Sequence, residues 1–430
     1  MEHSPGVPTK LAKTILTFYP LFPVPVYFSV LTGYPPLWVS LIIAIIPVGA
    51  HLWKTHRIIA RTPFDIPILI FIVGTVVGFI VSPDKNVATG ALSSTLASIL
   101  VYYGITTNSG APRKYWLWTG GILCLITLLL SLWFLSQGDH RVLFFNQWAF
   151  NLLSGLPKTV GPVLQWNTIG ALLAVVIPPL FVFAFFKYNN VVRVIALILW
   201  LFFTLVLFLS DSGAGWLAFI ISLAFILVCW RRWLLWVLIP TAGLLTSTAV
   251  IFYDKTKWLR TTFFTASLMG RVTLWQNTLV LLKGKAIIWG MGLGSWYKVY
   301  SGRYGSSVPI IVHDSYLQLY CDAGFLGFIA MVLAAVIFIR LSINLLKLSR
   351  SNSVSWIGIG LMGSIIAGAV FAIFDVTTSI TYVNDSRYIY LVLPLLWIGA
   401  ALISVVSSKL SSTLGRDAKQ SRLIDINIKG

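Results

Sequence analysis

About twelve apolar stretches alternate with short polar connectors along this chain of 430 residues. A helix needs roughly 20 apolar residues to cross about 30 Å of hydrocarbon. Only helices and closed barrels satisfy their backbone polar groups in lipid, and these runs lack the alternation of a barrel strand. The sequence therefore predicts an all-α polytopic membrane protein with a single integral membrane domain over residues 1–430. The predicted spans are 13–33, 37–53, 64–82, 88–107, 115–136, 163–186, 191–210, 212–230, 233–252, 318–343, 354–374 and 388–407.

Composition supports this class and narrows the possible partners. Only 10% of the residues are charged, whereas a soluble domain has about 25%. The formal net charge of +19 is not interpreted as affinity for nucleic acid, because no groove-reading motif accompanies it. Positive charge in the connectors instead sets topology and meets the anionic headgroups of membrane lipids.

The basic residues are distributed unevenly between the two sides of the predicted bundle. If the N-terminus is cytoplasmic, connectors on that side carry 19 of the 31 Lys and Arg residues. The other short loops hold only Lys85, Arg141, Lys158 and Arg387, and the remaining eight lie in one long segment, 254–313. Orientation follows the basic residues of short loops, and long loops are largely exempt. Both termini are therefore predicted to be cytoplasmic, and 254–313 is predicted to be an extracytoplasmic loop that carries the functional site.

The long loop contains the pattern of an amphipathic helix. Val272, Trp275, Leu279 and Leu282 recur at spacings of three and four. Arg271 is predicted at the start of this helix, where free backbone N–H groups and a guanidinium would converge on a docked anion. A plainer interpretation, in which Arg271 faces solvent or lipid headgroups, remains open.

His313 is the only histidine of the loop and stands where the chain re-enters the membrane. Asp314 is predicted to cap the span that follows. A helix N-terminus disfavours the imidazolium, so the neutral, base-competent form of His313 is expected there. A merely solvated histidine is the alternative. Asp322, in the first turns of the same span, is a candidate because charge at membrane depth is costly.

Other kinds of site receive little support. The three cysteines are scattered and without metal-ligand spacing, so we expect no metal site and no cofactor. The run Gly290, Gly292, Gly294 invites comparison with a nucleotide-binding loop. However, no strand is expected before it and no GK[ST] follows it.

Two ordered stretches resemble the O-antigen ligase/polymerase superfamily of bacterial membrane glycosyltransferases. The first runs from Gly270-Arg271-Val272-Thr273-Leu274-Trp275 into Gly290-Met291-Gly292-Leu293-Gly294. The second runs from His313-Asp314-Ser315-Tyr316-Leu317-Gln318 to Asp322-Ala323-Gly324-Phe325-Leu326-Gly327. The span that holds Asn167, Ala171 and Pro178 is similar to the family's asparagine-to-proline span. The resemblance covers roughly residues 60 to 405.

This resemblance implies a metal-independent transfer of a glycan from an undecaprenyl-pyrophosphate carrier to an acceptor outside the bacterial cytoplasmic membrane. The acceptor is a glycan, a lipid such as lipid A core, or a protein. Carried over, Arg271 would bind pyrophosphate and His313 would deprotonate the acceptor hydroxyl, while Trp275 and Asp322 would contribute to substrate binding. We favour a ligase. A repeat-unit polymerase and a non-enzymatic transporter of lipid-linked glycans remain as alternatives.

The chain departs from the family pattern at Gly213, in Ser212-Gly213-Ala214-Gly215-Trp216, where the family usually has arginine. One expected phosphate contact is therefore missing. Arg303, Lys255 and Arg387 are the candidates to replace it, and the sequence does not choose between them.

Overall fold

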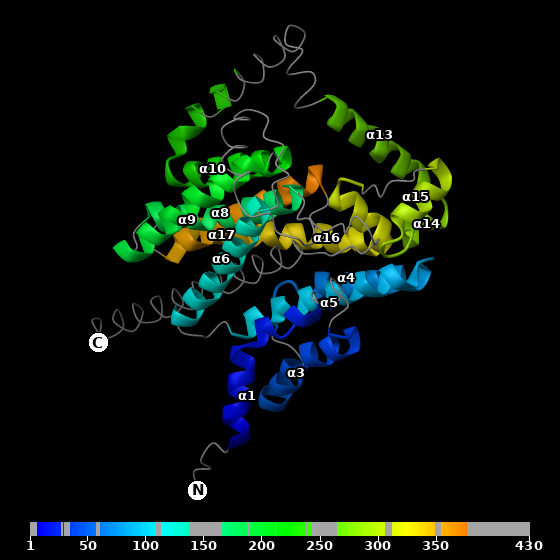
Figure 1. The fold of residues 1–430 in the computed structure, drawn as a ribbon, viewed down its shortest axis with the longest axis horizontal. Coiled ribbons are helices and arrows are strands. Elements are labelled where there is room, and N and C mark those ends of the chain that lie inside the picture. The colour runs from blue at the N-terminus through cyan, green and yellow to red at the C-terminus, as the bar shows by residue number, and fades with distance from the viewer. Residues whose placement is uncertain are drawn as a thin grey trace, which may run out of the picture.

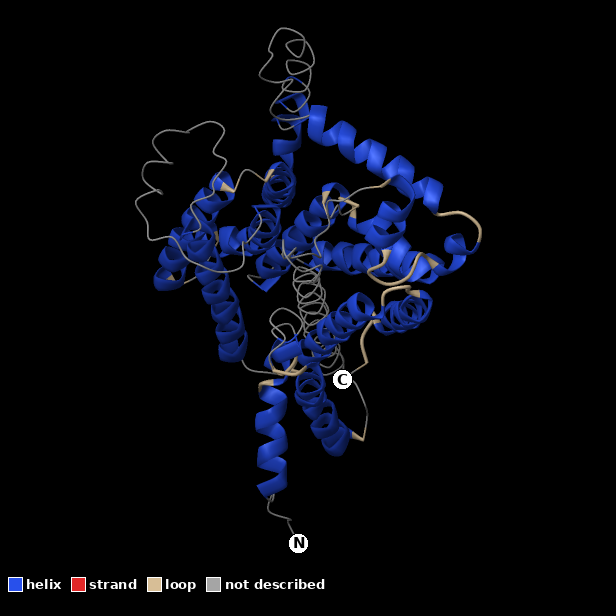
Figure 2. Cartoon of the chain, turned by 45° about the vertical axis from the view of Figure 1, so that its right-hand side comes forward, coloured by secondary structure: helices blue, strands red, loops and turns tan. Residues whose placement is uncertain are grey.

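The computed structural model describes residues 7–26, 29, 35–56, 61–108, 113–136, 166–186, 189–210, 212–237, 239–241, 244, 265–305, 312–348 and 354–375. This part of the chain is helical and contains no strand (Figure 2). Its long helices are α3 (Leu37–Thr55), α4 (Asp65–Val81), α5 (Lys85–Thr107), α6 (Arg113–Ser136), α8 (Trp166–Phe185), α9 (Asn190–Leu209), α10 (Gly213–Trp230), α16 (Ser315–Leu348) and α17 (Val354–Phe374).

These nine helices coincide with nine of the predicted spans. Seven of them are long and apolar enough to cross a membrane by the described residues, and α4 and the Gly120–Ser136 part of α6 are shorter apolar helices. The predicted span 388–407 and most of 233–252 lie outside the described residues. The all-α polytopic class is therefore confirmed for the described part of the chain.

The first predicted span, 13–33, is wrong as a continuous helix. Helix α1 (Val7–Thr17) ends near its start, and a short 3₁₀ helix, η1 (Tyr19–Leu21), follows. Pro20, Pro23 and Pro25 stand in this region. Proline lacks the N–H that the helix ladder needs, and its ring clashes with the preceding turn. The apolar composition therefore predicted a span where the prolines impose a break.

Helix α8 lies at the centre of one half of the molecule, packed against α9, α10 and α17 (Figure 1). Small residues make the contact with α17 close. A Cβ atom added at Gly360 would stand 3.0 Å from Cα of Pro179, and one at Gly363 would stand 3.2 Å from Cβ of Pro178. Close approach at small residues is the usual basis of helix association in membranes.

Helices α4 and α16 form the other close pair. A Cβ at Gly78 would lie 2.0 Å from the carbonyl oxygen of Asp322, and one at Gly74 would lie 3.0 Å from Cβ of Leu326. These two glycines of α4 are four residues apart, the spacing of a small-xxx-small contact. Because α4 touches α16 at Asp322–Leu326, its last turn lies beside the first turns of α16.

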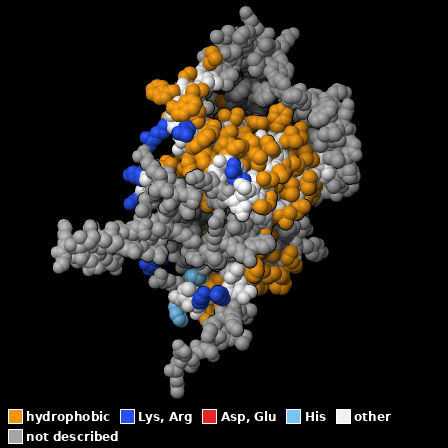
Figure 3. Space-filling view, turned by 90° about the vertical axis from the view of Figure 1, so that its left-hand side faces the viewer, with side chains coloured by type: hydrophobic (Ala, Val, Ile, Leu, Met, Phe, Trp, Pro, Cys, Tyr) orange, Lys and Arg blue, Asp and Glu red, His pale blue; other side chains and the backbone are white. Residues whose placement is uncertain are grey.

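The exposed side chains of the spans are largely apolar. Figure 3 shows one face of the molecule on which hydrophobic side chains cover a wide area. On α9 the exposed residues include Val194, Ile198, Leu201 and Leu205, which repeat at helical spacing along one side. This pattern is expected of helices that face lipid.

The long loop contributes three helices to the described part: α13 (Thr265–Leu281), α14 (Lys285–Trp289) and α15 (Trp296–Tyr304). A helix, α13, is present where the amphipathic helix was predicted, but the predicted apolar face is not the buried one. Leu274 and Thr278 are buried, whereas Leu279 is 57% exposed. Thr278 was not counted because it is polar. Its hydroxyl donates to the carbonyl of Leu274 and accepts from the Trp296 indole at 3.0 Å, which lets it face the interior.

Helix α16 is interrupted at Gly324, whose φ is +61°. A Cβ there would stand 2.3 Å from the carbonyl oxygen of Ile288, so only glycine allows the end of α14 to approach. Gly324 therefore marks a break between two helical segments of α16.

Candidate active site

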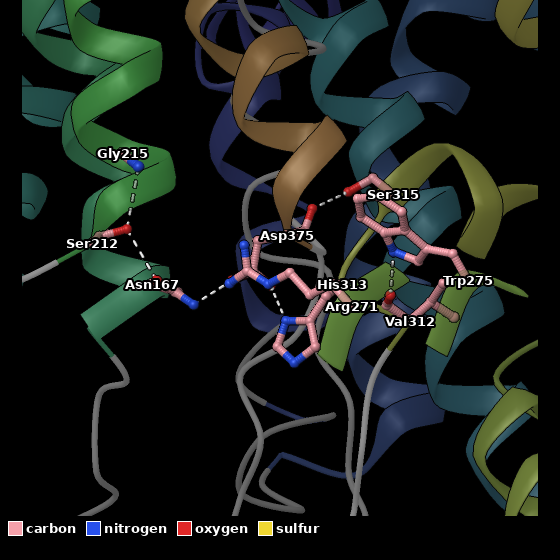
Figure 4. A network of polar contacts seen from close by, with 9 residues as sticks. All are labelled: Asn167, Ser212, Gly215, Arg271, Trp275, Val312, His313, Ser315 and Asp375. Carbon is pink, nitrogen blue, oxygen red and sulfur yellow. Dashed lines mark hydrogen bonds and ion pairs between the residues drawn. The ribbon is translucent and has the colours of Figure 1, made fainter. Parts of the chain in front are cut away.

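A buried aspartate, Asp375, lies at the centre of the candidate site (Figure 4). It follows the last residue of α17, and its backbone N–H still donates to the carbonyl of Phe371. Its side chain is only 2% exposed. A buried carboxylate is costly unless cations or hydrogen-bond donors surround it. The residues that do so include both predicted catalytic residues.

His313 contacts one oxygen of this carboxylate. Its Nδ1 atom lies 3.1 Å from Oδ1 of Asp375. An ionised carboxylate only accepts, so Nδ1 carries the proton in this pair and Nε2 keeps a free lone pair. The backbone of His313 has φ +53°, a left-handed conformation that is uncommon for residues other than glycine. The turn into α16 therefore holds the imidazole in a defined direction.

Arg271 approaches the other oxygen. One guanidinium nitrogen, Nη2, lies 4.0 Å from Oδ2 of Asp375, and the arginine side chain is 19% exposed. The histidine side chain is 30% exposed. The carboxylate is thus covered, while the two side chains that face it are partly exposed.

The predicted place of Arg271 on its helix is wrong. Helix α13 begins at Thr265, so Arg271 lies in its second turn and the first-turn N–H groups precede it. The apolar pattern that predicted the helix starts at Val272, so it did not reveal the first turns of α13, from Thr265. The guanidinium therefore does not act together with a helix N-terminus, and its position is set by Asp375.

Two polar residues from the other half of the molecule also belong to the site, one hydrogen-bonded to Asp375 and the other to the first. The Asn167 amide on α8 donates to Oδ2 of Asp375. The Ser212 hydroxyl donates to Oδ1 of Asn167 at 3.0 Å and accepts from the backbone N–H of Gly215, capping α10. A Cβ at Gly170 would lie 2.4 Å from Cβ of Ser212, so a glycine on α8 permits this contact.

Further hydrogen bonds tie the loop and the helix ends together. The Ser315 hydroxyl donates to the backbone carbonyl of Asp375 at 3.0 Å, and Tyr316 on α16 donates to the carbonyl of Ala369 on α17. The Trp275 indole donates to the carbonyl of Val312 at 3.0 Å, which fixes α13 beside the residue that precedes His313. Trp275, predicted to bind substrate, therefore has a positioning contact in this structure.

These residues come from four helix ends, namely the starts of α8, α10 and α16 and the end of α17. Consecutive spans run in opposite directions, so the starts of α8 and α10 lie on one side of the bundle, as do the start of α16 and the end of α17. The hydrogen bonds among Asn167, Ser212, His313 and Asp375 join both pairs. The site therefore forms at one face of the helical bundle.

Asp314 caps α16 as predicted. Its side chain accepts from the backbone N–H of Leu317 at 2.8 Å. Burial raises the pKa of Asp314, and backbone hydrogen bonds from Leu317 and Tyr316 oppose that rise.

Asp322 holds the glycine-rich turn through its hydrogen bonds. Its Oδ1 accepts from the backbone N–H of Gly294 and from the Gln318 amide, both at 3.0 Å. In the same turn, the Leu293 N–H donates to the Gly78 carbonyl, and a Cβ at Gly292 would lie 2.5 Å from Cα of Ser82. The glycine run is explained by close packing on α4 and α16. A substrate contact by Asp322 remains a prediction.

The candidates to replace the missing arginine are not brought to Asp375 by any described contact. Arg303 is an exposed residue in the last turn of α15, and Lys255 and Arg387 lie outside the described residues. Gly213 is exposed, and among the described residues nothing lies within 4 Å of the point its Cβ would occupy. The described residues also contain no group of three His, Cys, Asp or Glu side chains that could hold a metal ion.

Sequence reasoning missed Asp375, although a signal was present. It follows an apolar span of 21 residues directly, and a carboxylate at the edge of a span is a functional candidate by default. The resemblance had pointed to Asn167 and Ser212 without a role for either. Their role becomes visible only when α8, α10 and α17 are packed together.

One comparison with known proteins finds a family match over part of the chain. A family model described as O-Antigen ligase matches residues 196–332, a stretch that includes Ser212, Arg271 and His313. A search of the curated proteins finds no match. The match over residues 196–332 confirms the predicted resemblance to the O-antigen ligase family for that part of the chain.

Proposed function

We propose that this protein transfers a glycan from an undecaprenyl-pyrophosphate-linked donor to an acceptor hydroxyl, as an O-antigen ligase-like glycosyltransferase. The observation that carries the proposal is the meeting of Arg271 and His313 on the two oxygens of one buried carboxylate. A glycosyl transfer of this kind needs a base for the acceptor and a cation for the departing pyrophosphate. Both groups are present, and both are partly exposed.

In the proposed reaction, Nε2 of His313 takes the proton of the acceptor hydroxyl as its oxygen forms a bond to the anomeric carbon. The bond from that carbon to the pyrophosphate oxygen breaks, and undecaprenyl pyrophosphate leaves with the electron pair. Arg271 binds the pyrophosphate and stabilises its developing charge. Asp375 accepts the Nδ1–H of His313, which orients the ring and stabilises the imidazolium that forms.

The proposal places the site at the extracytoplasmic face of the bacterial cytoplasmic membrane, in the loop 254–313, with both termini cytoplasmic. The uneven distribution of Lys and Arg among the short connectors supports this orientation. The apolar helices and the family match agree with a bacterial membrane protein. The proposed reaction needs no metal ion, since Arg271 takes the place of a cation at the pyrophosphate.

Purified protein reconstituted in liposomes with a synthetic polyprenyl-pyrophosphate glycan and a candidate acceptor, followed by mass spectrometry, tests the proposal. Capture of the glycan by a lipid A core acceptor indicates a ligase, and lengthening of the donor glycan indicates a polymerase. Transfer is expected to persist when EDTA is added. An unchanged donor moved across the bilayer would indicate a transporter and would contradict the proposal.

A further inference from the structure

Helix α14 is a short apolar helix in an otherwise polar and basic part of the chain. Its Ile287, Ile288 and Trp289 are 48%, 54% and 43% exposed. Lys283 and Lys285 stand exposed at its start. Three consecutive exposed apolar residues are unusual on a surface that water covers.

The exposed apolar side chains of α14 adjoin those of a membrane span. The Tyr320 hydroxyl on α16 donates to the carbonyl of Ile287 at 2.7 Å, and the Tyr320 ring contacts that of Phe328. Gly324 lets the backbone of α14 at Ile288 touch α16. Figure 1 shows α14 beside α16. We define the α14 surface as Ile287, Ile288, Trp289, Phe325 and Phe328.

The α14 surface continues into the exposed face of α16. After Phe325 and Phe328, the exposed large hydrophobic residues are Val332, Val336, Ile339 and Ile343, at spacings of three and four. A single apolar face that runs along a candidate span is the face that meets hydrocarbon. Because α14 extends this face at the beginning of the span, it lies at the depth where the span leaves the membrane.

The basic residues around α14 favour contact with the anionic surface of a lipid bilayer. The segment between Asp254 and Asp314 contains eight Lys and Arg residues and no acidic residue. Lysines beside an apolar helix meet anionic headgroups, and tryptophan is favoured at the boundary between headgroups and acyl chains.

We propose that the α14 surface docks into the lipid bilayer at its headgroup–acyl boundary, with Lys283 and Lys285 among the phospholipid phosphates. This contact anchors the loop that carries Arg271. Gly284, with φ +58°, and a hydrogen bond from the Lys283 N–H to the Leu281 carbonyl make the link between α13 and α14 a tight turn. The depth of α14 in the bilayer therefore constrains the tilt of α13. This inference concerns membrane docking and does not depend on the proposed reaction.

Site-directed spin labelling of the full chain in liposomes tests the docking. Cysteines are introduced singly at Ile287 and Ile288 in a chain that carries Cys124→Ser and Cys229→Ser; Cys321 is fully buried and is retained. Labels at Val336, on the exposed face of α16 outside the α14 surface, and at Arg303 are the lipid and water references. The chain without an introduced cysteine reports background labelling. The readout is the relaxation of the label by oxygen, which concentrates in lipid, and by a water-soluble nickel complex.

Labels at 287 and 288 are expected to relax more with oxygen than with nickel, as at Val336, and opposite to Arg303. Greater relaxation by nickel would show that the α14 surface faces water and would overturn the proposal. Protection from both reagents would show that protein covers it, either a second copy or another chain, and would equally overturn it. Agreement between two adjacent positions guards against a local disturbance by either label.

Discussion

Nδ1 of His313 and Nη2 of Arg271 face opposite oxygens of the Asp375 carboxylate, at 3.1 Å and 4.0 Å. One buried carboxylate thus contacts two residues, from α13 and from the start of α16, that we propose as the cation and the base. The Asn167 amide on α8 donates to the same carboxylate. A change at Asp375 is therefore expected to disturb His313 and Arg271 together.

Asp375→Asn is expected to reduce glycan transfer by about two to four orders of magnitude. The amide can donate to Nδ1 and so favour the wrong tautomer of His313, which removes the lone pair at Nε2. Initial rates in liposomes measure the effect. Asp314→Asn is the matched control, since asparagine caps a helix about as well as aspartate. Equal losses in the two variants would argue against the assigned role of Asp375.

Arg271→Ala and His313→Ala are each expected to abolish measurable transfer while membrane insertion stays intact. Removal of a group that stabilises a developing charge typically costs about 10²–10³-fold in rate. Lys283→Ala, which removes an exposed cation of the same loop, is expected to do little. Transfer assays paired with a protease-accessibility test of insertion separate lost chemistry from lost folding. Normal transfer by His313→Ala would remove the base assignment.

Asn167→Asp is expected to lower transfer by at least tenfold at neutral pH. The change sets a second carboxylate against Asp375, and two adjacent carboxylates do not both ionise readily. The proton shared between them weakens the acceptor that His313 needs. Activity measured from pH 5 to pH 8 reports the effect, with Asn190→Asp at the exposed start of α9 as control. An unchanged rate would mean that the Asn167 contact is not coupled to the reaction.

Asp314→Asn is expected to stabilise the protein at neutral pH, and less so in acid. Burial raises the pKa of Asp314 in the folded protein, so the folded state holds its proton more tightly than the unfolded state does. Stability therefore falls as pH rises above the ordinary aspartate pKa of about 3.9. Asparagine removes this loss. Thermal unfolding at pH 4 and pH 7 should show the larger gain at pH 7, and a larger gain at pH 4 would refute the argument.

Gly324→Ala is expected to destabilise the protein strongly. A left-handed backbone costs about 1–3 kcal/mol for a residue with a side chain, and the new Cβ would also press on the Ile288 carbonyl at 2.3 Å. The thermal midpoint of the purified protein measures this. Gly120→Ala is the control, because no described atom lies within 4 Å of its Cβ position. Similar midpoints for both variants would contradict the packing seen at the break in α16.

The sequence predicted the features that depend on local composition. Apolar runs located nine of the spans, and the cap at Asp314 followed from residue type and position. Arg271 and His313 were singled out from the loop as the cation and the base. The span and cap predictions succeeded because hydropathy and helix capping are properties of short segments, whereas the roles of Arg271 and His313 stay predictions.

Features that depend on packing between distant segments were not predicted. Asp375 is 62 residues from His313 and 208 from Asn167, and no local pattern links them. The buried face of α13 was shifted because Thr278 finds a partner, Trp296, from another helix. The prolines between Pro20 and Pro25 indicate a break in the helix, but the prediction of this span followed hydropathy alone.

The dependence of the site on α17 has a consequence for biogenesis. Asp375, at the end of α17, contacts both His313 and Arg271. During synthesis these two residues are therefore made well before the carboxylate that holds them together. If the proposed reaction is right, transfer starts only after synthesis has passed residue 375 and α17 has packed against α8. A chain that stops short of that point would insert into the bilayer without ever turning over substrate.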